Sequence, residues 1–191
     1  EPGLRITGLC SHFAGVEPGD QRPADEQAGR FRAACDAAAA RLPGPLFRHM
    51  SSGRGALNFP AHDFDGVRPG IVLYGYGGGG AGARFHTRPI LQWKTSLLQV
   101  RDVPADFPVS YDSTYRTPAP TRLGVLAAGY SDGYPRALSN RGCVLVGGRR
   151  CDIVGRVTMN WIVADLGPGA AATSGDEVVL IGQQGDACMW A

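Results

Sequence analysis

The chain has 191 residues, of which 43% are hydrophobic and 19% charged, as is typical of a globular protein. Its formal net charge of +2 is too small to indicate a nucleic-acid partner or a membrane surface. No apolar run approaches the roughly 20 residues of a membrane span. The five cysteines are scattered and form no CxxC pair, which argues against a zinc site or a disulfide framework and predicts a cytoplasmic location.

The first part of the chain predicts alternating strands and helices. A strand is expected over residues 4–11, a helix over 20–42 and a short strand over 46–50. The apolar end of the segment 67–75 predicts a further strand. This order is typical of a parallel sheet or part of a (β/α) barrel. Because the chain opens almost directly on a strand and lacks signal-peptide features, we expect it to begin inside a longer protein.

After a glycine-rich joint at 77–82, the pattern changes to strands separated by turns. These strands are expected over residues 90–103, 123–128, 142–146, 151–159, 162–166 and 177–181. The predicted fold class is therefore α/β plus all-β. Residues 1–84 are expected to be the end of a barrel, and 85–191 a mostly antiparallel β domain of barrel or sandwich type.

The most informative stretch is 108–136, which holds four of the six tyrosines: Tyr111, Tyr115, Tyr130 and Tyr134. A tyrosine beside a buried strand is usually a core residue with a satisfied hydroxyl. Glycine and serine neighbours at two strand ends favour a functional site, because such loops bring backbone close to a ligand. The spacing leaves open which site this is.

Seven segments together resemble the alanine racemase family, in family order and with near-family spacing. They are GLCSHFA (8–14), FRHMSSGRGAL (47–57), FDGVRPGIVLYG (64–75), PVSYDSTY (108–115), AAGYSDGYPR (127–136), VGRVTMNW (154–161) and VVLIGQQGD (178–186). The family fold is a (β/α)8 TIM-type barrel that holds pyridoxal 5'-phosphate (PLP), followed by a β domain. The resemblance implies that the family's PLP lysine precedes this chain and that the family's final segment follows it. Lys94, the only lysine, lies outside the cofactor strand.

The resemblance implies a two-base reaction, in which a proton is removed from one face of the α-carbon and returned to the other. One base is the PLP lysine and the other is a tyrosine, whose position falls on Tyr111. A phenol has an ordinary pKa of about 10 and needs a donor or cation nearby to act as a base. In the family His12 lies behind the cofactor ring and near that tyrosine.

The remaining cofactor contacts are also implied by the resemblance. Arg68 matches the residue facing the pyridine nitrogen, and Gly70 and Ile71 match backbone donors to the phosphate. Gly53 falls on another phosphate position, where the family usually has serine. No metal site is expected.

For the substrate, Met159 matches a backbone donor to the carboxylate, and Tyr130 matches a gate tyrosine that favours a small amino acid. Glu17, His49, Arg136 and Arg156 fall on positions that line the entry corridor. The family is a homodimer in which the β domain of one subunit completes the active site of the other.

The function expected from these matches is interconversion of L- and D-alanine, supplying D-alanine for peptidoglycan. This chain alone is expected to be inactive. A serine or broad-specificity racemase is one alternative. The other is a non-catalytic module, which Gly53 and the replacement of a usual aspartate by Asn160 favour slightly.

Overall fold

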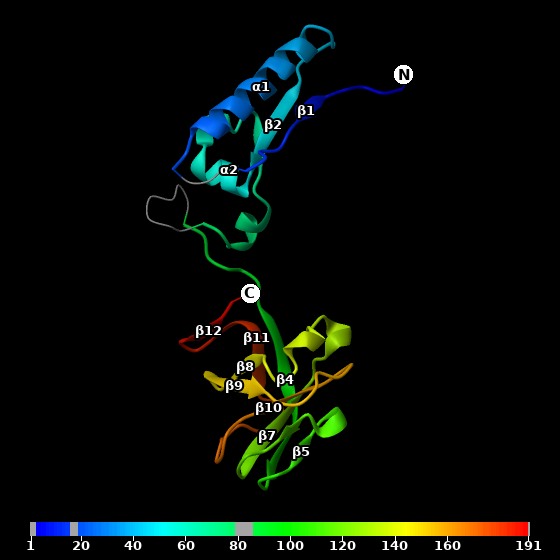
Figure 1. Cartoon of the computed structure of the whole chain (residues 1–191), viewed down its shortest axis with the longest axis vertical. Coiled ribbons are helices and arrows are strands. Elements are labelled where there is room, and N and C mark those ends of the chain that lie inside the picture. Colours follow the sequence, from blue (N-terminus) through cyan, green and yellow to red (C-terminus); the bar gives the residue numbers. More distant parts are fainter. Residues whose placement is uncertain (1–2, 16–18, 79–85, 191) are drawn as a thin grey trace. The chain divides into compact units, whose positions relative to one another are not determined.

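The computed structural model describes residues 3–15, 19–78 and 86–190. Its internal contacts divide the chain into two units, Glu1–Ile90 and Leu91–Ala191 (Figure 1). They are called here the N-terminal and the C-terminal unit. The boundary expected between residues 84 and 85 lies outside the described residues.

The N-terminal unit contains a three-stranded parallel sheet with strand order β1-β2-β3. The strands are β1 (Gly8–Cys10), β2 (Phe47–Ser52) and β3 (Gly66–Arg68). Helix α1 (Arg22–Ala39) connects β1 to β2, while α2 (Gly53–Asn58) and the 3₁₀ helix η1 (Pro60–His62) connect β2 to β3. Parallel strands joined by helical connections confirm the predicted β–α alternation.

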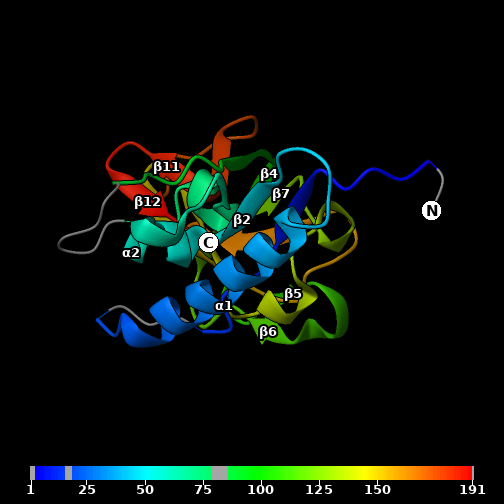
Figure 2. The ribbon, with the colours of Figure 1, turned by 90° about the horizontal axis from the view of Figure 1, so that it is seen from above.

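Helix α1 packs on the sheet through one apolar face, and it lies beside β2 in Figure 1 and Figure 2. The buried residues Ala24, Ala28, Phe31 and Cys35 recur at helical spacing. Proline in the first turn is compatible with a helix start, because the first N–H groups have no partner within the helix. This face forms the unit's core together with other buried side chains, including Phe13, Met50 and Phe59.

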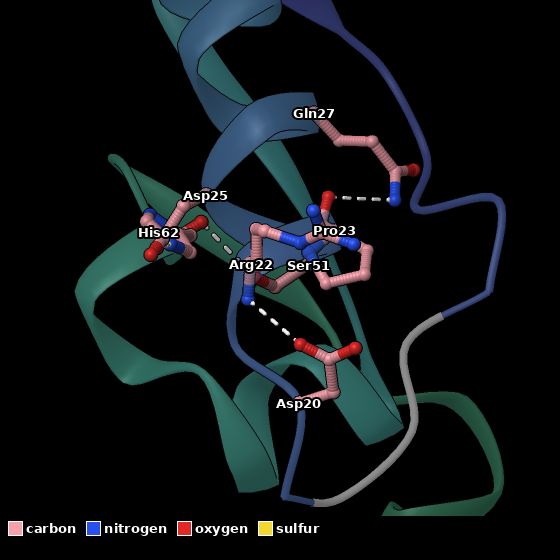
Figure 3. Close-up of polar contacts among 7 residues, drawn as sticks. All are labelled: Asp20, Arg22, Pro23, Asp25, Gln27, Ser51 and His62. Carbon is pink, nitrogen blue, oxygen red and sulfur yellow. Dashed lines mark hydrogen bonds and ion pairs between the residues drawn. The ribbon is translucent and has the colours of Figure 1, made fainter.

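The first turn of α1 is tied to η1 by a buried histidine (Figure 3). His62 is 7% exposed, and its Nε2 lies 2.7 Å from Asp25 Oδ1. The Ser51 hydroxyl on β2 donates to the His62 carbonyl at 3.0 Å. Helix, strand and connecting segment are therefore fixed to one another by polar contacts as well as by apolar packing.

One local prediction for this unit was wrong, and one short helix was not predicted. The apolar segment after Pro69 is not a strand but the 3₁₀ helix η2 (Gly70–Tyr74), which Gly70 enters at φ +53°. Ile71 and Leu73 are 66% and 68% exposed, so this segment does not form the buried strand that its composition suggests. Helix α2 was missed because it contains two glycines, which have low helix propensity.

The C-terminal unit is an antiparallel β-barrel. Its sheet has the order β12-β11-β4-β7-β10-β9-β8, and an additional β11–β8 pairing joins the sheet to itself. Closure removes the unpaired edges that an open sheet would present. The strands are β4 (Trp93–Val103), β5 (Pro108–Val109), β6 (Tyr115–Arg116), β7 (Thr121–Leu126), β8 (Cys143–Val146), β9 (Arg149–Ile153), β10 (Ile162–Asp165), β11 (Glu177–Gln184) and β12 (Ala187–Met189).

The predicted β domain is thus confirmed, with two differences. The strand predicted over 151–159 ends at Ile153, and Gly155 then adopts φ +77°, which a strand does not use. The short pair β5–β6 and the strand β12 were not predicted. Gly124 fits β7 because a Cβ there would lie 2.7 Å from Leu97 Cδ2, inside the packed barrel.

Within the described residues, no helix has the length and hydrophobicity needed to cross a membrane, and no cluster of metal-ligating side chains occurs.

Replacing Leu126 with alanine should destabilise the C-terminal unit. Leu126 is fully buried in the barrel core, so the cavity should lower the free energy of unfolding by about 2–5 kcal/mol. Urea denaturation of the Leu126→Ala variant measures this. Leu98→Ala is the matched control, because Leu98 is 46% exposed on β4. Equal losses for the two variants would contradict the assigned core.

Candidate active site

In the N-terminal unit, two of the predicted site residues, His12 and His49, meet at the Arg68 guanidinium. Arg68 lies at the end of β3, and its Nη2 donates to the Ser11 carbonyl at 2.7 Å and contacts His12 Nδ1 at 3.0 Å. Its Nη1 contacts His49 Nδ1 on β2. One permanently charged side chain thus joins the three strands near their carboxyl ends.

These contacts determine how the two histidines present their protons. A guanidinium only donates, so each Nδ1 accepts from Arg68. The proton of the neutral His12 ring is therefore on Nε2, which leaves that atom as a hydrogen-bond donor. His49, predicted for the entry corridor, lies in this cluster, while Glu17 lies outside the described residues.

The predicted phosphate residues lie at two adjacent helix starts. A Cβ on Gly53, the first residue of α2, would be 2.5 Å from the Pro69 carbonyl oxygen and 2.7 Å from Val72 Cγ2. Gly53 therefore lets α2 begin directly against the loop that leads into η2. Space is open beside Gly70, where an added Cβ would meet nothing within 4 Å.

This arrangement fits a pyridoxal phosphate. Initial N–H groups of helices have no partner within the helix and bind anions, so α2 and η2 offer donors for a phosphate. Arg68 offers a fixed cationic donor for a ring nitrogen at the same edge of the sheet. The closeness of Pro69 also explains why glycine stands at position 53, where the family usually has serine. A serine side chain would have no space there.

In the C-terminal unit, Tyr111 stands on an exposed turn, η3 (Tyr111–Ser113), between β5 and β6. Its side chain is 69% exposed and lines a cleft of about 370 Å³. Trp161, at 53% exposure, lines the same cleft. The predicted catalytic tyrosine is therefore open to solvent on this unit, beside an aromatic ring that the sequence did not single out.

The other tyrosines of this stretch differ in their surroundings. Tyr134 is 5% exposed, and burial raises its pKa to about 12. Tyr115 is half-buried, and burial, with a smaller contribution from Asp165 and Asp152, raises its pKa as well. A raised pKa makes a phenol a weaker donor of its proton, which suits a supporting role rather than deprotonation.

The predicted substrate residues Tyr130 and Met159 lie together. The Ser131 N–H and hydroxyl both donate to the Met159 carbonyl, at 3.0 and 2.6 Å. A Cβ on Gly129 would lie 2.2 Å from that carbonyl oxygen, so only glycine allows this approach. Asn160 Nδ2 donates to the Ser131 hydroxyl at 3.1 Å, which gives Asn160 a structural role in this contact.

The two predicted corridor arginines of this unit lie in different places. The Arg156 guanidinium is 2.9 Å from Asp112 Oδ2, directly beside Tyr111. Arg136 begins the 3₁₀ helix η5 (Arg136–Leu138), and its side chain is exposed. Lys94 forms an exposed ion pair with Glu177 at 2.9 Å, on two paired strands of the barrel.

Both units match models of one enzyme class, the alanine racemases. The model "Alanine racemase, N-terminal domain" matches residues 1–77, and "Alanine racemase, C-terminal domain" matches 90–191. The chain belongs to the alanine racemase family, as the sequence motifs indicated. The family match and its solved structures confirm the fold class, the end of a (β/α) barrel followed by a β domain.

Relatives and solved structures agree with this. The chain is 42% identical over 188 residues to the alanine racemase of Syntrophobacter fumaroxidans, covering 96% of this chain and 49% of that protein. The alanine racemase of Bacillus anthracis with bound L-Ala-P matches with TM-score 0.86 and 31% identity, over 99% of this chain and 49% of that one. The Bartonella henselae enzyme with covalently bound pyridoxal phosphate matches with TM-score 0.74 and 30% identity, over 93% and 48%. The chain thus spans about half the length of these relatives.

Replacing Arg68 with lysine should weaken the N-terminal unit even without cofactor. Lysine keeps the charge but cannot bind Ser11, His12 and His49 together, so the free energy of unfolding should fall by about 1–3 kcal/mol. Urea denaturation of the Arg68→Lys variant checks this against Arg30→Lys on the exposed side of α1. An Arg68→Lys variant as stable as the control would contradict the linking role.

Proposed function

We propose that this chain is part of a PLP-dependent racemase that interconverts L- and D-alanine. The observation that carries the proposal is the Arg68 guanidinium, held at the joined ends of three parallel strands beside two helix starts. Family membership supports the same reading. The activity is proposed for the longer protein of which this chain is about half, by comparison with its relatives.

When bound, pyridoxal phosphate supplies a ring that withdraws electrons from the substrate α-carbon. Arg68 donates a hydrogen bond to the ring nitrogen and, being permanently protonated, does not give its proton to it. By leaving that nitrogen unprotonated, Arg68 would weaken the electron withdrawal of the ring and so favour return of a proton to the α-carbon over side reactions such as transamination. The N–H groups of Gly53, Gly70 and Ile71 bind the phosphate.

Tyr111 moves the proton on one face of the α-carbon through its Oη atom. The PLP lysine, on a strand that this chain does not contain, acts on the other face. In the proposed homodimer, His12 of one subunit would support Tyr111 of the other by donating from Nε2, the atom that the Arg68 contact leaves protonated. The exposure of Tyr111 supports a role toward a group outside its own unit.

The substrate is positioned by the loops around β7 and β10. The Met159 backbone N–H binds the carboxylate, and Tyr130 narrows the entry so that a small side chain such as that of alanine fits. By their match to family positions, we propose His49, Arg136 and Arg156 for the entry corridor; Glu17, proposed for the same corridor, lies outside the described residues. The protein acts in the cytoplasm and supplies D-alanine for peptidoglycan.

The active site is completed in a homodimer, where Tyr111, Tyr130 and Met159 of one subunit act on the cofactor of the other. Tyr111, Met159 and Trp161, each more than half exposed on the C-terminal unit, support this arrangement. The residues that favoured a non-catalytic module now have local explanations, since Gly53 contacts Pro69 and Asn160 binds Ser131. We therefore propose a racemase and not a non-catalytic module. Measuring racemisation of serine as well as alanine tests the range of substrates.

Replacing Tyr111 with phenylalanine in the full-length protein should lower racemisation by at least about 100-fold, because one of two bases is lost. Each base serves one face, so exchange of the α-hydrogen with D₂O should be lost from one enantiomer of alanine and persist from the other. NMR of L- and D-alanine in D₂O measures this. Tyr115→Phe is the control and should stay within about twofold of the parent. Unchanged racemisation by Tyr111→Phe would exclude the catalytic role.

Mixing two inactive variants tests the shared active site. One carries Tyr111→Phe and the other replaces the PLP lysine. In a hybrid dimer with shared sites, one site receives both defects and the other receives none. Random mixing of equal amounts after denaturation and refolding should make about half of the dimers hybrids, each with one of its two sites intact. About a quarter of parental activity should therefore be restored. Sites contained within single subunits would restore none, and refolding each variant alone is the control.

A further inference from the structure

Tyr111 lies in an unusual backbone segment. Its neighbours Ser110 and Asp112 have φ values of +60° and +58°, and Ser113 follows at +48°. Residues with a side chain rarely adopt this left-handed region, because Cβ crowds the following carbonyl. Such strain persists only where the surroundings hold the chain in place, and it is often found at functional sites.

Arg156 supplies two of the contacts that hold this segment. Its backbone carbonyl accepts a hydrogen bond from the Ser110 hydroxyl at 2.8 Å. Its guanidinium Nη2 pairs with Asp112 Oδ2 at 2.9 Å. One residue therefore contacts the side chains on both sides of Tyr111.

The segment that carries Arg156 is itself fixed in place. Gly155 adopts φ +77°, and a Cβ there would lie 2.8 Å from both Ser110 Cβ and the Val109 carbonyl oxygen. The Gly155 N–H donates to Asn140 Oδ1, and Asn140 Nδ2 donates to the Thr114 hydroxyl at 3.2 Å. These contacts tie the segment to both ends of the Tyr111 turn.

We propose that Asp112 and Arg156 are positioning residues for Tyr111, acting through the turn between them. The inference rests on the proposed function and adds to it two residues that fix the direction of the catalytic phenol. Asp112 is 66% exposed and Arg156 37%, so solvent screens their attraction and the pair contributes little to global stability. Its effect should therefore appear in turnover rather than in the melting temperature.

The sharpest variant is Asp112→Asn in the full-length protein. Asparagine tolerates the left-handed region but lacks the charge, so this change removes the ion pair without adding backbone strain. Displacement of a reacting group by a fraction of an ångström should lower kcat by roughly 10-fold, with KM within about twofold. Arg156→Gln should do the same, Arg156→Lys should recover part of the loss, and the Asp112→Asn/Arg156→Gln double variant should be no worse than either single one.

A second measurement avoids any need for activity. With ¹³C-labelled tyrosine and no added cofactor, the ring signal of Tyr111 is identified by its absence in Tyr111→Phe. In Asp112→Asn this signal should shift or broaden, while the other tyrosine signals stay in place. Asp106→Asn is the matched control, because Asp106 also has φ +59° and pairs with an arginine, Arg116, at 3.0 Å. The control should change neither kcat nor the Tyr111 signal.

The outcomes separate the two proposals. If Tyr111→Phe abolishes racemisation while Asp112→Asn leaves kcat and the Tyr111 signal unchanged, the positioning role is overturned and the proposed function stands. If Tyr111→Phe leaves racemisation intact, the proposed catalytic role fails. A fall in the melting temperature of Asp112→Asn that is large enough to account for its lower turnover would assign the pair to folding and overturn the positioning role.

Discussion

The N-terminal unit depends on one cation placed where three strands end. The Arg68 guanidinium binds the Ser11 carbonyl and the ring nitrogens of His12 and His49, so the edge of the sheet is organised before any cofactor binds. A group that only donates also fixes which nitrogen of each ring keeps its proton. Structure and chemistry are thus linked through one side chain: the contacts that hold the strands together orient the donors that a pyridine ring would meet.

In the C-terminal unit, two glycines let the loops of the candidate site come together. Gly129 and Gly155 each lie where a Cβ would be under 3 Å from another backbone or side chain. Their small size lets the segment from Gly155 to Trp161 approach the turn that carries Tyr111 and the turn that carries Tyr130. Met159 is thereby held beside Tyr130, and Arg156 beside Tyr111. These loops connect strands of the closed barrel, and such surroundings can hold strained backbone in place.

The sequence predicted the architecture because its signals are local and repeated. Apolar periodicity identified α1, and apolar runs between turns identified most barrel strands. It failed where neighbours decide the outcome. Residues Ile71–Tyr74 are apolar enough for a strand, yet Gly70 turns the chain into a 3₁₀ helix. Helix α2 has poor intrinsic propensity but is stabilised by packing, since Gly55 and Ala56 are buried.

The residues of the candidate site also divide into those that the sequence could predict and those that depend on neighbours in space. Motif resemblance proposed Tyr111, Arg68 and Met159, but it did not single out Asp112, and it proposed Arg156 only as part of a corridor. Their pairing depends on a positive φ at Asp112 and on the close approach of Gly155, neither of which leaves a spacing pattern in the sequence. The departure at Gly53 has the same origin, because its side-chain space is occupied by Pro69, distant in sequence. The residues proposed to touch a ligand are therefore visible in motifs, whereas the residues proposed to position them become visible only once the backbone is in place.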